Sequence, residues 1–82
     1  MKKKKTVKIN SVVEILNDAI VREVESFTYY ADSAKQAEDP IIKKLFLQLA
    51  QIEEGHRIQL EGKLKEVLAQ IEIDQAMTGE FL

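Results

Sequence analysis

The only proline of the 82-residue chain, Pro40, lies near its middle, and apolar residues recur at steps of three and four on both sides of it. Such spacing places the apolar side chains along one face of a helix. Asp39 is suited to cap a second helix, and Pro40 can occupy the first turn of that helix without losing a hydrogen bond. The sequence therefore predicts two long helices that fold back on each other as an antiparallel hairpin.

The expected boundaries of the two helices come from capping signals and from the loss of the spacing. Ser11 and Glu14 have the S-x-x-E spacing of a capping box, which predicts that the first helix begins near residue 11. The pattern of the second helix fades in the segment that starts at Asp74. The sequence thus divides into a basic, disordered arm over residues 1–10, a helical hairpin over residues 11–73, and a loose tail over residues 74–82.

A chain of this size needs help to stay folded. Below about 80 residues, a single core rarely supplies enough free energy without disulfides, a metal or a partner chain. The sequence contains no cysteine, which excludes disulfides, iron–sulfur clusters and thiolate zinc sites. The apolar stripe of the second helix is also wider than one partner helix can cover. We therefore expect an all-α fold in which the hairpin forms a homodimer, a four-helix bundle, with higher homo-oligomers left open.

The charge of the chain is divided unevenly. Five lysines lie within the first eight residues, so residues 9–82 carry 7 basic against 14 acidic side chains, a net charge of −7. An acidic body argues against nucleic-acid binding, which requires clustered Lys and Arg on the folded surface. No apolar run is long enough for a membrane span, and the first residues do not resemble a secretory signal. The expected location is the cytoplasm.

Three polar residues, Glu23, Glu53 and His56, occupy positions on the otherwise apolar stripes. Each one alone would ordinarily be an edge residue, part of a buried ion pair, or a core histidine with satisfied hydrogen bonds. In a hairpin that turns between Glu38 and Asp39, however, Glu23 lies about 23 Å from the turn along the first helix, and the mean distance of Glu53 and His56 from the turn along the second helix is about 24 Å. The i, i+3 spacing of Glu53 and His56 places both on one helical face. We therefore expect the three side chains to converge at one level of the interior.

A bound cation explains such a cluster better than packing does, because buried carboxylates without a countercharge are destabilising. One hairpin supplies three ligands, and a two-fold dimer doubles them to four carboxylates and two imidazoles, enough for two octahedral ions. Mixed carboxylate and imidazole ligation suits iron or manganese. A purely structural role for the three residues remains the alternative.

Several segments, taken in order, resemble the rubrerythrin and ferritin-like superfamily. They are Ala19–Glu23, Tyr29-Tyr30, the Asp39-Pro40 break and Leu49–His56. The resemblance covers roughly residues 11–68. Because only one hairpin is present, the chain is similar to the half-ferritin branch, the encapsulated ferritins, whose two-helix chains build a ferritin-like four-helix bundle and its di-iron centre across a subunit interface.

The resemblance implies a ferroxidase that oxidises Fe²⁺ to Fe³⁺ for iron storage in a separate compartment, with O₂ or peroxide as oxidant. It implies two irons per dimer, with Glu23, Glu53 and His56 as the catalytic ligands. By the same resemblance Tyr30 lies beside the ligands, unless it is a core aromatic with a bonded hydroxyl. The alternatives are a rubrerythrin-like protein that detoxifies peroxide at a di-metal site, and a non-catalytic helical oligomer that metal holds together.

Two further expectations come from the same branch. Encapsulated ferritins often carry extra acidic residues that attract iron, although a solvated charged face is the alternative here. The candidates are Glu25, Asp32, Glu54 and Glu61. The final residues 78–82 are similar to peptides that dock into a shell protein, which would place the chain inside a protein nanocompartment.

Overall fold

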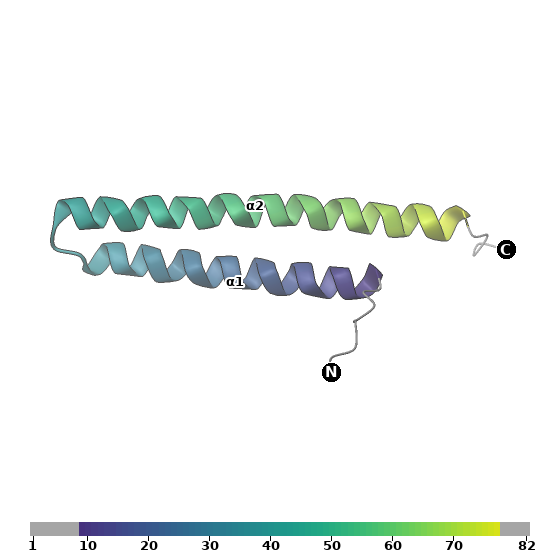
Figure 1. Cartoon of the computed structure of the whole chain (residues 1–82), viewed down its shortest axis with the longest axis horizontal. Helices are drawn as coiled ribbons and strands as arrows, with labels where there is room; N and C mark the ends of the chain where they lie inside the picture. Colours follow the sequence, from purple (N-terminus) through teal and green to yellow (C-terminus); the bar gives the residue numbers. More distant parts are fainter. Residues whose placement is uncertain (1–8, 78–82) are drawn as a thin grey trace, which may run out of the picture.

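The computed structural model describes residues 9–77, which form two antiparallel helices joined by a short turn (Figure 1). Helix α1 spans Ile9–Gln36, and helix α2 spans Pro40–Met77. The two helices pack along the whole of α1, and α2 continues beyond it at the open end (Figure 1). The predicted all-α hairpin is therefore confirmed. Within the described residues, neither helix has an apolar stretch that would cross a membrane.

The turn has the capping chemistry that its sequence predicts. The Asp39 carboxylate oxygen Oδ1 accepts hydrogen bonds from the backbone N–H groups of Ile41, at 2.7 Å, and Ile42, at 3.3 Å. These donors lie in the first turn of α2, where no helical carbonyl is available to them. Pro40 occupies the first helical position, where a backbone N–H is not needed. Asp39 and Pro40 thus fix where α2 begins.

The helices extend past both boundaries expected from the sequence. Helix α1 begins at Ile9, two residues before the expected start near residue 11, so Ser11 lies within its first turn. Helix α2 continues to Met77, so residues 74–77 are helical and do not belong to a loose tail. No Gly or Pro interrupts either end, and Gln70 Nε2 donates a hydrogen bond to Asp74 Oδ1 at 2.8 Å. The expected arm over residues 1–8 and the expected docking peptide over 78–82 lie outside the described residues.

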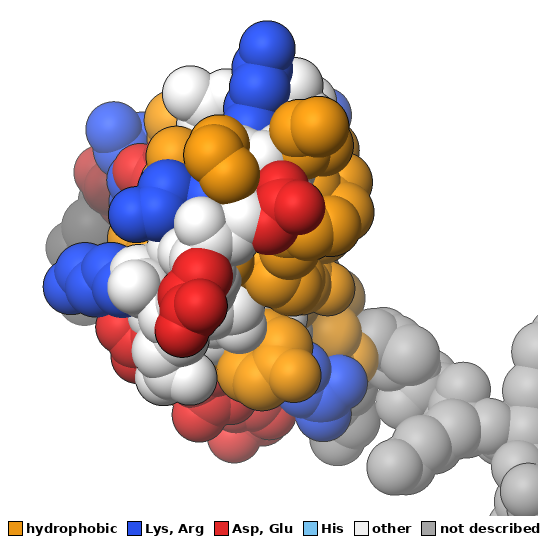
Figure 2. All heavy atoms as spheres, turned by 90° about the vertical axis from the view of Figure 1, so that its left-hand side faces the viewer, with side chains coloured by type: hydrophobic (Ala, Val, Ile, Leu, Met, Phe, Trp, Pro, Cys, Tyr) orange, Lys and Arg blue, Asp and Glu red, His pale blue; other side chains and the backbone are white. Residues whose placement is uncertain are grey.

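The hairpin buries little of its apolar surface. Among the described residues only Ala34 and Ala50 are buried, whereas fourteen large apolar side chains are exposed. Figure 2 shows that, seen from the turn, apolar side chains gather on one side of the hairpin and charged side chains dominate the other. The apolar face of α2 is formed by residues spaced by three and four. They are Ile42, Leu45, Leu49 and Ile52.

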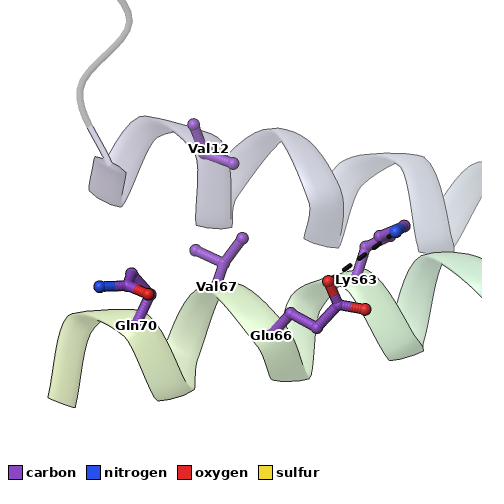
Figure 3. Close-up of a pocket in the computed structure, with 5 residues that line it drawn as sticks. All are labelled: Val12, Lys63, Glu66, Val67 and Gln70. Atoms are coloured by element: carbon purple, nitrogen blue, oxygen red, sulfur yellow. Dashed lines mark ion pairs between the residues drawn. The ribbon is translucent and has the colours of Figure 1, made fainter. Parts of the chain in front are cut away.

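A shallow pocket opens at the end of the hairpin that lies away from the turn (Figure 3). Its lining comes from one residue of α1 and four of α2: Val12, Lys63, Glu66, Val67 and Gln70. An ion pair joins Lys63 Nζ to Glu66 Oε1 at 3.8 Å. Lys63 and Gln70 follow His56 at intervals of seven residues, so the pocket lies on the same face of α2 as His56.

Candidate metal centre

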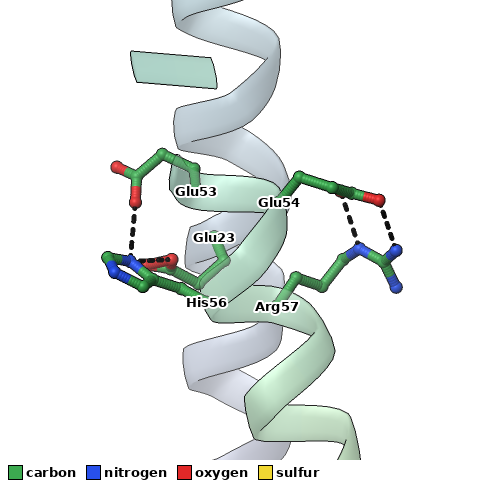
Figure 4. Close-up of polar contacts among 5 residues, drawn as sticks. All are labelled: Glu23, Glu53, Glu54, His56 and Arg57. Atoms are coloured by element: carbon green, nitrogen blue, oxygen red, sulfur yellow. Dashed lines mark hydrogen bonds and ion pairs between the residues drawn. The ribbon is translucent and has the colours of Figure 1, made fainter. Parts of the chain in front are cut away.

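The three polar residues of the apolar stripes meet on one flank of the hairpin, beside the two helices (Figure 4). Glu23 projects from α1, and Glu53 and His56 project from α2 toward it (Figure 4). The His56 ring nitrogen Nδ1 lies 3.1 Å from Glu23 Oε2 and 3.0 Å from Glu53 Oε1. The predicted convergence of the three side chains at one level is confirmed, but the cluster is not interior to the hairpin, because the His56 side chain is 53% exposed. The hairpin turn brings Glu23 to His56 across 33 residues of sequence.

The cluster holds two carboxylates and a single hydrogen-bond donor. Carboxylate oxygens of ionised Glu only accept hydrogen bonds, so Nδ1 must carry a proton to bond with either of them. Both Glu side chains are 19% exposed, whereas the His56 side chain is 53% exposed. The carboxylates are thus partly removed from water while one shared proton lies between them. A cation in the same place would compensate their charge more fully.

The donor set fits a transition-metal ion. One ligand atom from each of Glu23, Glu53 and His56 lies within 4.8 Å of the others, so a single ion can contact all three. Two carboxylates and an imidazole are ligands that iron and manganese accept. An ion bound through Nδ1 must displace the proton held there. The identity of the metal stays a prediction.

A sequence profile of the rubrerythrin family matches residues 14–81, most of the chain. The chain belongs to the rubrerythrin family. It is therefore a ferritin-like protein of a di-iron, metal-binding family, and the three ligand candidates lie within the matched residues. Comparisons with curated proteins and with solved structures found no significant match. Membership of the encapsulated-ferritin branch stays a prediction.

Tyr30 packs between the helices, two helical turns along α1 from Glu23. Its ring stacks on Phe46 of α2 with 6.5 Å between centroids, and Tyr29 meets its edge at 5.5 Å. Within residues 9–77, no hydrogen bond to the Tyr30 hydroxyl is found. Tyr30 is thus an inter-helix aromatic with a free hydroxyl, and its expected role beside the metal stays a prediction.

A second polar cluster lies on the opposite flank of α2 (Figure 4). Arg57 donates from Nε and Nη2 to both carboxylate oxygens of Glu54, and from Nη1 to Glu61 Oε2 at 2.7 Å. The hydrogen bond with Arg57 is the main cause that lowers the pKa of Glu54 below its usual value; desolvation opposes it, and the charge of Arg57 adds a lesser lowering effect. The hydrogen bond with Glu54 is the largest cause that raises the pKa of Arg57, and the hydrogen bond with Glu61 is the next.

Sequence reasoning assigned Glu54 and Glu61 to iron attraction and overlooked Arg57. The signal was present, because Arg57 follows Glu54 by three residues and precedes Glu61 by four, and such spacing lets oppositely charged side chains pair on a helix. The guanidinium now compensates part of their charge. Their attraction for a free cation is correspondingly weakened.

Glu25 and Asp32 are not brought to the metal centre. They follow Glu23 by two and nine residues, which corresponds to about 200° and 180° around a helix. Both therefore project from the side of α1 opposite to Glu23, and both are exposed. Any role in attracting iron would act through their charge at a distance, and it stays a prediction.

Proposed function

We propose that this chain is a ferroxidase, which binds Fe²⁺ at Glu23, Glu53 and His56 and releases Fe³⁺ for storage in a separate compartment. The observation that supports this most directly is the group of three donor atoms within 4.8 Å, drawn from both helices and opening onto an exposed face. Membership of a di-iron family supports a redox role for that group. We propose storage in a separate compartment because a small oligomer of such hairpins would enclose no space for a mineral.

The three ligands contribute differently to binding of the substrate Fe²⁺. The carboxylates of Glu23 and Glu53 supply negative charge, which stabilises Fe³⁺ more than Fe²⁺ and so favours oxidation. The His56 ring turns Nδ1 toward both carboxylates, and this nitrogen becomes a ligand once its proton leaves. Bound iron supplies the redox chemistry, and the chain fixes the position of the ions and the access of the oxidant.

The centre requires a second copy of the chain. Three ligand atoms leave an octahedral ion half-coordinated, and two ions with six protein ligands arise when two hairpins face each other. The apolar face of α2 continues the three-and-four spacing directly to His56. Leu45 and Ile52 on this face are 46% and 52% exposed, which a partner chain would cover. We place the interface of a homodimer here.

The decisive experiment mixes anaerobic, Fe²⁺-loaded protein with air and follows ferric absorbance. The proposal expects rapid oxidation that saturates at two Fe²⁺ per dimer. His56→Ala should oxidise Fe²⁺ no faster than buffer does, while the matched control Glu54→Ala, on the opposite flank, should retain the rapid phase. Zn²⁺ should inhibit, because it accepts the same ligands but has no redox chemistry. Rapid oxidation by His56→Ala, or by neither protein, would reject the ferroxidase.

The oxidant is settled by supplying O₂ or peroxide separately. A ferroxidase should stop when Fe²⁺ is exhausted with either oxidant. Repeated consumption of peroxide in the presence of an added reductant would instead assign the chain to peroxide detoxification, the other chemistry weighed for this family. Metal binding without any rapid oxidation would leave a structural role for the ion.

A further inference from the structure

Arg57 lies within reach of a ligand candidate that it does not contact. It follows Glu53 by four residues, a spacing at which oppositely charged side chains pair on a helix. Around α2, Arg57 lies about 40° from Glu53 and about 60° from Glu54 on the other side. Glu53 is also the less exposed carboxylate, at 19% against 41% for Glu54, so water would screen an ion pair with Glu53 less. Spacing and burial thus both favour a contact between Arg57 and Glu53.

The guanidinium of Arg57 is instead held by two other carboxylates. Glu54 accepts hydrogen bonds from Nε, at 3.0 Å, and from Nη2, and Glu61 accepts one from Nη1 at 2.7 Å. Figure 4 shows that the Arg57 side chain extends toward Glu54 and away from Glu53. All three guanidinium nitrogens therefore donate on the flank of α2 that lies opposite to the metal centre.

A guanidinium that turned to Glu53 would compete with the metal ion. Its N–H groups would donate to the carboxylate oxygens that the ion requires, and its positive charge would repel the ion. Arg57 keeps its charge and accepts no hydrogen bond, so it cannot become a ligand as His56 can. A side chain of this kind, four residues after a ligand, is compatible with tight metal binding when other groups retain it elsewhere.

We propose that Glu54 and Glu61 are positioning residues, which hold the guanidinium of Arg57 away from Glu53 and so keep that carboxylate free for the metal ion. This inference rests on the proposed metal centre and adds residues that set its affinity. Either carboxylate can retain Arg57 without the other, so replacement of Glu54 alone leaves the contact of Nη1 with Glu61. Loss of both carboxylates releases the guanidinium.

The test is a cycle of variants in which calorimetry measures Zn²⁺ affinity, so that binding is read without oxidation. The variants are Glu54→Gln/Glu61→Gln, Arg57→Gln, and the triple variant that combines them. In the parent chain, loss of the two carboxylates should lower Zn²⁺ affinity about 10-fold, the lower end of the effects of groups that support metal ligands. In the Arg57→Gln chain the same loss should be at most about 3-fold, the scale of exposed charges.

General electrostatic attraction predicts the opposite order. Without the compensating charge of Arg57, the carboxylates of Glu54 and Glu61 would attract a cation more strongly. Their replacement would then cost at least as much affinity in the Arg57→Gln chain as in the parent chain. That result, or no loss in either chain, would overturn the proposal. The matched control is Glu25→Gln/Asp32→Asn, which removes two exposed carboxylates of α1 and should have the same effect with and without Arg57.

Two further measurements separate this inference from the proposed function. Circular dichroism checks that each variant folds, and His56→Ala, which lacks the only histidine, identifies the Zn²⁺ binding that belongs to the centre. Rapid Fe²⁺ oxidation by the parent chain without any loss that depends on Arg57 would overturn the role of Glu54 and Glu61 and leave the ferroxidase standing. A loss that depends on Arg57, without rapid oxidation, would support that role and reject the ferroxidase. Zn²⁺ binding that His56→Ala leaves unchanged would overturn both.

Discussion

Two clusters with nearly the same sequence pattern lie back to back on α2. One is Glu53-x-x-His56 with Glu23, and the other is Glu54-x-x-Arg57 with Glu61. In the second cluster, the guanidinium of Arg57 is always charged, and its N–H groups donate hydrogen bonds to the carboxylate oxygens. In the first, the single ring proton of His56 can leave. The difference teaches that the residue at the fourth position decides whether two helix-borne carboxylates form a closed ion pair or a site open to a cation.

The largest effect should come from turning the first cluster into the second. In His56→Arg the guanidinium should fill the carboxylate oxygens of Glu23 and Glu53 permanently. We expect Fe²⁺ affinity to fall at least about 100-fold, since loss of merely an outer hydrogen-bond partner costs about 10- to 100-fold. Equilibrium metal binding measures this. Gln59→Arg, which adds the same charge one turn further along, is the control, and equal loss in both would assign the effect to general electrostatics.

A smaller effect is expected from a change in the backbone of α2 that leaves the side chains of both clusters in place. Gly55 lies between Glu54 and His56 in sequence, and a Cβ added there meets nothing within 4 Å. Gly55→Ala should therefore stabilise α2 by about 1 kcal/mol, because Gly costs about that much in a helix interior. Thermal unfolding of the metal-free protein measures it, with Gly62→Ala as the matched variant. Iron binding should not change, and a loss of binding would mean that Gly55 contributes to the centre.

Replacing one carboxylate in each cluster should give effects of opposite sign. In the metal-free protein, Glu53→Gln removes repulsion from Glu23 and should raise stability by about 0.5 kcal/mol, the scale of partly exposed charge pairs. Glu54→Gln removes the best hydrogen-bond partner of Arg57 and should lower stability at neutral pH. Urea unfolding with a chelator present compares the two. Destabilisation by Glu53→Gln would show that the hydrogen bond from His56 outweighs the repulsion.

The smallest expected effect is a pH dependence of the second cluster. The pKa of Glu54 is lowered in the folded chain from its ordinary value of 4.5. Its contribution is therefore fully present above pH 4.5 and is lost as the pH falls through the folded pKa. Urea midpoints should decline more steeply in acid for the parent chain than for Glu54→Gln. Identical acid profiles would mean that solvent screens the Arg57 contacts completely.

Most of the fold follows from local chemistry that the sequence displays. Asp39 and Pro40 cap α2 by interactions within a few residues, so they act in the same way in any fold. The meeting of Glu23 with His56 was also accessible, because rise per residue and a known turn convert sequence distance into height. Both predictions required only the capping preferences of single residues, the rise per residue of a helix, and the helix break at Asp39-Pro40.

The sequence analysis was less accurate for the helix boundaries, where several neighbouring residues can each begin or end a helix, and for the ion pairs of Arg57. Ser11 matches a capping box, but nothing before it stops the helix, so its side chain is not needed as a cap. Helix α2 likewise loses its apolar spacing before it ends at Met77. Arg57 was overlooked because pattern reading followed the apolar stripe, and its pairing depends on side-chain rotamers that a stripe does not specify.

The short connection between the helices has a consequence for length variation. Each residue inserted between Glu23 and the turn, or between the turn and Glu53, would shift the ligands of that helix by about 1.5 Å and rotate them by about 100° relative to those of the other helix. The hairpin would survive such an insertion, but the three donor atoms would no longer meet. Related chains should therefore tolerate additions and deletions at the two free ends and keep the count of residues between their ligands constant.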